Sequence, residues 1–173
     1  MLKSRGQKML KSIHLFAAAL WIGGVVCSLF AVTTLPTMHE PAAVLAVCNV
    51  FELLDYGCIC VGAMLIMATA CIYGLCTPWR FFRNRWIVAK WAGALAIIVS
   101  GSLLTIPSVD SIRKACTSMP VDFSLPAYAD PFRLLIVLLS SMTILLFSIV
   151  LISVFKPRIG IRGGRPQSSN GGK

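Results

Sequence analysis

The sequence predicts an all-α fold, a four-helix transmembrane bundle. Hydrophobic residues make up 57% of the 173-residue chain, charged residues only 13%, and the mean hydropathy is +0.83. A chain this apolar is not a soluble domain. Four segments reach the roughly 20 apolar residues that a helix needs to cross a hydrocarbon core, namely 10–35, 53–76, 86–106 and 132–155. We expect them to form a single domain over residues 1–155.

The first segment, 10–35, follows several basic residues and therefore has the charged start of a secretory signal peptide. We expect it to be a membrane span instead. Its apolar run is longer than the hydrophobic region of a signal, and three more apolar segments follow it.

The later segments differ in composition. Residues 42–52 would lengthen the second segment to a helix of over about 50 Å, so we expect a bend or an interfacial piece there. The third segment is rich in Gly and Ala, which let helices approach closely in lipid. The fourth lacks glycine and should be mainly a lipid-facing packing helix.

The connection between the third and fourth segments, residues 107–131, contains four prolines and is predicted to be irregular.

Basic residues alternate between the two ends of the predicted bundle. They occur before the first span, in the second loop (Arg80, Arg83 and Arg85) and in the tail, 156–173, but not in the first loop, 36–41. This positive-inside pattern predicts a multi-pass protein of the cell's inner (cytoplasmic) membrane with both termini cytoplasmic. It accounts for the net charge of +10 without nucleic acid as a partner. The basic tail is predicted to be disordered.

The seven cysteines do not define a disulfide framework, because most of them fall inside predicted spans. Cys48 and Cys116 are expected on the outer side. A disulfide between them is compatible with an oxidising compartment, but the sequence does not determine whether it forms.

Two ionisable residues fall inside spans, where such groups are costly and usually functional. His14 lies about one turn into the first span, and Lys90 about one turn into the third, which starts on the same side. We therefore expect them at a similar depth. A neutral imidazole is a common metal ligand, and a neutral amine can be one.

Small residues follow both groups and leave room for something flat and bulky, such as a porphyrin. His14 shares a helix stripe with Ala18 and Trp21, and Gly93 and Ala94 lie one turn above Lys90. The alternative is structural: Lys90 would extend to the headgroups, and His14 would cap a helix or bond a carbonyl at the interface.

A spaced pattern in the first and third spans resembles a superfamily of small membrane proteins. It reads Lys11-x-x-His14-x6-Trp21-x-Gly23-Gly24, with Arg85-Trp86-x3-Lys90 in a later span. The superfamily includes J-type protoporphyrinogen oxidases, the membrane domain of copper-resistance protein D and an uncharacterised family known only as a domain of unknown function. The resemblance implies a b-type haem with His14 and Lys90 as axial ligands. Residues 25–34 lack the Arg and Tyr-His cluster of the oxidases, so the oxidase reaction is not implied.

A sulfur-rich stripe in the second span suggests a different ligand. Cys60, Met64, Met67 and Cys71 are spaced to share one helix face, and soft sulfur suits Cu(I). Because Met and Cys are also ordinary apolar fillers, the stripe is equally typical of packing.

Three hypotheses follow. The first is a membrane b-type haem protein that transfers electrons or oxidises a membrane-soluble partner such as a quinone or a porphyrinogen, with His14, Lys90 and Trp21 at the haem. The second is a copper(I) transport or handling protein that uses the sulfur stripe. The third is a non-catalytic membrane subunit. The oligomeric state stays open, and no nucleophile, nucleotide loop or zinc motif favours soluble-enzyme chemistry.

Overall fold

The structure is a computed structural model that describes residues 4–76 and 85–155, and this part of the chain is almost entirely helical. Its helices are α1 (Ser4–Thr33), α2 (Pro41–Leu54), α3 (Val61–Cys76), α4 (Arg85–Ser100), α5 (Ile106–Ser118) and α6 (Pro126–Phe155). A short 3-10 turn, η1 (Leu35–Thr37), follows α1. The π-helical segments η2 (Asp55–Cys60) and η3 (Gly101–Thr105) join α2 to α3 and α4 to α5, so each pair forms one long rod.

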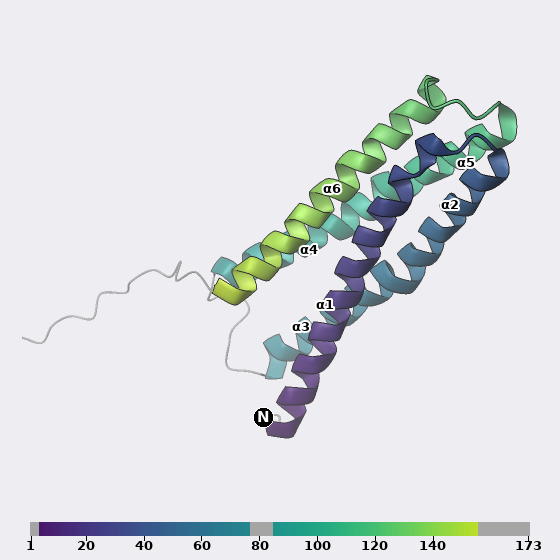
Figure 1. Cartoon of the computed structure of the whole chain (residues 1–173). Coiled ribbons are helices and arrows are strands. Elements are labelled where there is room, and N and C mark those ends of the chain that lie inside the picture. Colours follow the sequence, from purple (N-terminus) through teal and green to yellow (C-terminus); the bar gives the residue numbers. More distant parts are fainter. Residues whose placement is uncertain (1–3, 77–84, 156–173) are drawn as a thin grey trace, which may run out of the picture.

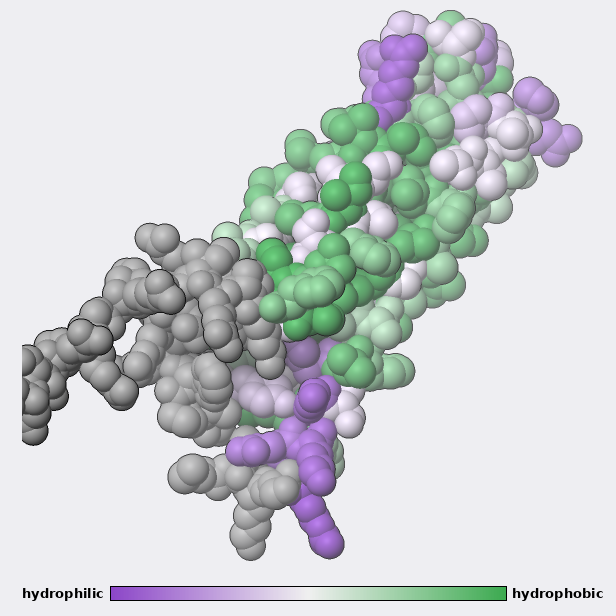
Figure 2. Space-filling view, turned by 60° about the vertical axis from the view of Figure 1, so that its left-hand side comes forward, coloured by the Kyte–Doolittle hydropathy of each residue, from purple (hydrophilic) through white to green (hydrophobic). Residues whose placement is uncertain are grey.

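Four helical rods in the described part of the chain are long and apolar enough to cross a membrane. They are Arg5–Thr37, Pro41–Gly74, Ile87–Ser118 and Pro126–Phe155. Large hydrophobic side chains are exposed along them, among them Phe16, Phe30 and Phe147. Figure 2 shows this apolar surface between hydrophilic residues gathered toward the two ends. The predicted all-α class with four apolar spans is confirmed.

The rods are longer than the predicted spans, and two predictions at their outer ends need correction. Residues 41–52 belong to α2, which the π-helical segment η2 joins to α3, so they are not a separate interfacial piece. The prediction of an irregular segment was wrong for residues 107–118, which lie in α5, and for residues 126–131, which begin α6. Pro107 is accommodated because it stands in the first turn of α5, directly after η3, where regular i to i−4 hydrogen bonds are already interrupted.

The two ends of the bundle differ in packing, as Figure 1 shows. We call the end with Thr33, Pro41, Ser118 and Pro126 the closed end. There α1, α2, α5 and α6 pack around buried side chains such as Leu35, Val44, Phe51, Ile112, Tyr128 and Leu135.

At the opposite end, which we call the open end, α1 begins and α6 finishes. Here α1 packs on α3 while α4 packs chiefly on α6, and the two pairs diverge (Figure 1). The first and last described helices thus start and finish at the same end of the bundle. The predicted tail, 156–173, lies outside the described residues.

Two glycines, Gly24 on α1 and Gly62 on α3, lie at the contact between these two rods. A Cβ added to Gly62 would lie 2.8 Å from the backbone N of Trp21 and 3.0 Å from the carbonyl O of Ala17. One added to Gly24 would lie 2.8 Å from the side chain of Ile59. Gly62 therefore permits a close approach of two helix backbones, which is how small residues stabilise helix pairs in lipid.

The change Gly62→Ala should lower the free energy of unfolding by about 1–3 kcal/mol, because backbone atoms would have to move apart to admit the methyl group. The measurement is denaturant unfolding in detergent. Gly23→Ala is the matched control, since no atom lies within 4 Å of its added Cβ. Equal stabilities of the two variants would contradict the close-contact interpretation.

The closed end contains a salt bridge between two rods. Arg113 on α5 pairs with Glu52 on α2 at 2.7 Å, and both side chains are partly exposed, so the pair stabilises by no more than about 1 kcal/mol. In the α5–α6 connection, hydrogen bonds from the hydroxyl and the backbone N–H of Ser124 lower the pKa of Asp122 below its ordinary value. Cys48 and Cys116 are buried free thiols in the structure.

Candidate functional site

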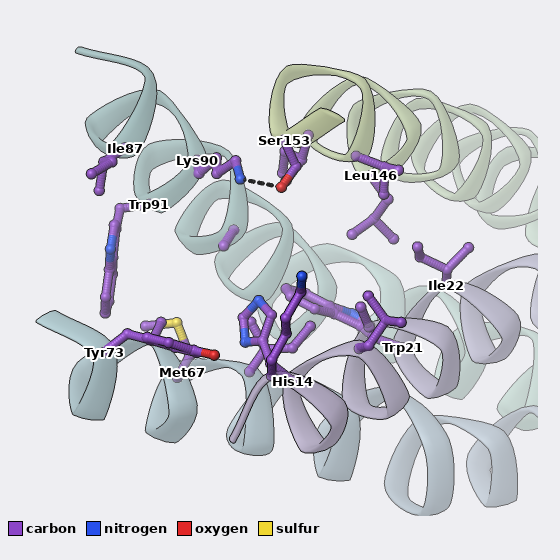
Figure 3. A pocket seen from close by; sticks show the side chains of 18 of the residues that line it. His14, Trp21, Ile22, Met67, Tyr73, Ile87, Lys90, Trp91, Leu146 and Ser153 are labelled. Atoms are coloured by element: carbon purple, nitrogen blue, oxygen red, sulfur yellow. Dashed lines mark hydrogen bonds between the residues drawn. The ribbon is translucent and has the colours of Figure 1, made fainter. Parts of the chain in front are cut away.

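The divergence of the helix pairs at the open end creates a cavity of about 840 Å³. Its walls come from α1 and α3 on one side and from α4 and α6 on the other (Figure 3). We call it the fork cavity. Apolar side chains form most of its surface, including Ile22, Ile66, Ala94, Leu146 and Ile149. The fork cavity lies within the part of the molecule that is apolar enough to be embedded in a membrane.

His14 and Lys90 both line the fork cavity. His14 comes from α1 and Lys90 from α4, and Figure 3 shows them on facing walls. The two residues were predicted to share a depth because each lies near the start of its span. The structure brings them to one cavity, although α1 and α4 are not principal packing neighbours.

The imidazole of His14 is fixed by a hydrogen bond across the α1–α3 contact. Its Nδ1 lies 2.7 Å from Oγ1 of Thr69, which is buried. The Thr69 hydroxyl also lies 2.7 Å from the carbonyl oxygen of Leu65 and 3.0 Å from that of Ile66. A hydroxyl has one hydrogen, and a carbonyl can only accept one. Thr69 therefore donates to its own helix and accepts from His14.

In the neutral ring, this chain of hydrogen bonds favours the tautomer of His14 in which Nδ1 carries the hydrogen and Nε2 keeps its lone pair. No hydrogen-bond partner for Nε2 occurs among the described residues. A neutral imidazole with a fixed Nδ1–H and an acceptor Nε2 is the state in which histidine binds a metal.

The amine of Lys90 is also positioned. Its Nζ donates a hydrogen bond of 2.6 Å to Oγ of Ser153 on α6 (Figure 3). A neutral amine can make this bond and still offer its lone pair to a metal, whereas an ammonium can only act as a charge. Lys90 could therefore act either as a second ligand or as a positive charge near His14.

Aromatic side chains complete the walls. Trp21 is 2% exposed and joins the core, and its indole N–H has no partner within the described chain. Tyr73 presents its ring at 88° to that of His14 at a centroid distance of 6.4 Å, and its hydroxyl donates to the carbonyl of Gln7 at 3.3 Å. Trp91 lines the opposite wall.

Two of the small residues that follow His14 and Lys90 in the sequence line the fork cavity. They are Ala18 and Ala94, each one turn above the ionisable residue of its helix. Gly93 does not line it, because a Cβ there would lie 3.0 Å from Ile149 on α6. Gly93 instead lets α4 pack on α6.

The sequence did not predict that Thr69 and Tyr73 lie at the site. A hydroxyl within a helix normally bonds the carbonyl one turn back, and Thr69 does so. Its second bond, to His14, depends on the packing of α3 on α1. The only signal in the sequence was a Thr in an otherwise apolar stretch, one turn before Tyr73.

The sulfur residues predicted as a copper face do not converge. Met64 is 72% exposed and Cys71 is exposed on the outside of α3, whereas Met67 lines the fork cavity. Cys60 lies 3.9 Å from the carboxylate of Asp55. No group of three His, Cys, Asp or Glu side chains that could hold a metal ion occurs in residues 4–76 and 85–155. Copper binding stays a prediction.

Comparison of the chain with protein-family models, with curated proteins and with solved structures found no match. Without a match, only the fold and the site describe what class of protein this is. It is a four-helix bundle, apolar enough to cross a membrane, with a polar pair inside an apolar cavity at one end.

Proposed function

We propose that the protein is an integral membrane b-type haem protein whose haem occupies the fork cavity. One observation supports this above all: the Thr69 hydrogen bond leaves Nε2 of His14 as a free acceptor on the cavity wall. The volume of about 840 Å³ falls within the range of about 300–1,000 Å³ that is usual for cofactor sites. The apolar walls suit a porphyrin skeleton.

In this proposal each residue has a separate role. His14 is an axial ligand held in orientation by Thr69, and Lys90 is either the second ligand or a nearby positive charge. Trp21 and the apolar residues of α6 exclude water from the ring faces. A bound haem would supply one-electron chemistry, with a potential set by ligand identity, burial and outer hydrogen bonds.

The setting of the cavity favours a membrane-soluble redox partner. Beside the fork cavity α4 packs on α6 rather than on α3, and apolar side chains form most of the cavity walls. We propose that electrons pass to or from a molecule dissolved in the bilayer, such as a quinone or a porphyrinogen. The basic residues before the first span place the open end on the cytoplasmic side in this account.

A haemin titration of the detergent-purified protein, cleared of any bound cofactor, tests the proposal. We expect a sharp Soret band that saturates at one haemin per chain. The control is His39→Ala, because His39 lies in the short connection before α2, at the closed end, and does not line the cavity. Uptake that fails to saturate, or that is the same in a His14→Ala variant, would contradict it.

A further inference from the structure

We propose that Lys8 and Lys11 bind carboxylates at one end of the cavity's ligand, so that the fork cavity selects an amphipathic acid. The inference deepens the proposed function and rests on it for the porphyrin skeleton, whose two propionates would be the carboxylates. It concerns two residues outside the His14–Lys90 pair.

The first support is position. Lys8 and Lys11 line the fork cavity from the first turns of α1, about two turns and one turn, respectively, closer to the open end than His14. Both side chains are exposed, whereas Trp21 and Ala17, further along α1, are buried. The cavity thus has an apolar interior and a cationic mouth. The two lysines are about 4.5 Å apart along the helix axis, which suits two acid groups on one edge of a ligand.

The second support is the placement of the acidic residues. All six acidic side chains of the chain are described, and each lies on the closed half of the bundle: Glu40, Glu52, Asp55, Asp110, Asp122 and Asp130. None lines the fork cavity, whose described walls include three amines, those of Lys8, Lys11 and Lys90. The protein therefore brings no carboxylate side chain of its own to this end.

The third support is that the acidic partner in the described salt bridge lies far from the cavity lysines. The salt bridge within the described residues joins Arg113 to Glu52 at the closed end, far from Lys8 and Lys11. Amines at the edge of a low-dielectric cavity gain most from an anion that arrives with the ligand, because charge-assisted hydrogen bonds are about twice as strong as neutral ones. An anionic group on the ligand would complete the site.

The test compares two ligands that differ only in charge. Metal-free protoporphyrin and its dimethyl ester share one apolar skeleton, and neither needs an iron ligand. Their affinities are measured in uncharged detergent by quenching of tryptophan fluorescence, since Trp21 and Trp91 line the cavity. We expect the wild type to bind the free acid at least about tenfold more tightly than the ester.

The variants are Lys8→Gln/Lys11→Gln and, as a matched control, Arg5→Gln. Arg5 lies on the same helix at the same end, but it does not line the cavity. The double variant should lose the preference for the acid, and the control should keep it. Equal binding of acid and ester by the wild type, or a full preference in the double variant, would overturn the inference.

Failure of the haem proposal gives a different result. His14→Ala should leave the preference for the metal-free acid unchanged, because no iron is present. If haemin does not bind at His14 but the acid preference depends on Lys8 and Lys11, the carboxylate site stands and the haem proposal fails. If haemin binds through His14 and the preference is absent, the carboxylate site fails alone.

Discussion

Replacing His14 with alanine is expected to weaken haemin binding by more than the roughly 10–100-fold that loss of an outer hydrogen-bond partner costs. The change removes the nitrogen that the structure holds as a neutral acceptor on the cavity wall. It should leave the fold intact, since the side chain is only partly buried and lies beside the cavity. Haemin affinity, read from the Soret band, is the measurement.

Added imidazole provides an internal control for this variant. A free imidazole can enter the space left by the His14 side chain and replace the lost nitrogen, so part of the Soret band should return. Lys90→Met should behave differently. It keeps His14 and its bond to Thr69, so haemin should still bind, with an altered spectrum if Lys90 is the second ligand. An unchanged affinity in His14→Ala would remove His14 from the haem site.

The second large effect is expected from Thr69→Val, which keeps the side-chain shape but removes the acceptor for the Nδ1–H of His14. Without this acceptor the ring can rotate or exchange its hydrogen between nitrogens, so Nε2 is no longer held as the free acceptor. Haemin affinity should fall by about 10–100-fold, the usual cost of losing an outer partner of a metal ligand.

Thr69→Ser is the matched variant. Its hydroxyl can still donate to the carbonyl of Leu65 and accept from His14, so binding should stay close to that of the wild type. The unfolding midpoints of both variants show whether the packing of α3 on α1 has changed. If Thr69→Val is as stable as the wild type and binds haemin equally well, Thr69 does not position His14.

Hydropathy was sufficient to predict the four rods, because charged residues are costly in lipid and are therefore scarce in a membrane span. The same regularity predicted that His14 and Lys90 lie at a similar depth, since each follows the start of its own span by about one turn, and the structure places both on one cavity. Two long apolar helices that begin on one side place their first turns at one depth. No knowledge of helix packing was needed for this prediction.

Two features that the sequence did not predict, the helix that continues through Pro107 and the position of the cavity, depend on how the helices pack. Pro107 and the charges near it suggested a loop, but the π-helical segment before Pro107 lets the helix continue. The cavity lies between two helix pairs: α4 packs on α6, with Gly93 against Ile149, and α3 packs on α1, with Gly62 against Trp21. Such pairings join residues distant in the chain, so no local pattern specifies them.

The central claim, that His14 holds a haem in the fork cavity, is tested most directly by the visible spectrum of the detergent-purified protein from haem-replete cells. The spectrum is taken before and after reduction with dithionite. We predict a Soret band that shifts on reduction, with α and β bands that are absent from His14→Ala prepared in parallel. A colourless wild type, or a spectrum that His14→Ala retains in full, would contradict the account.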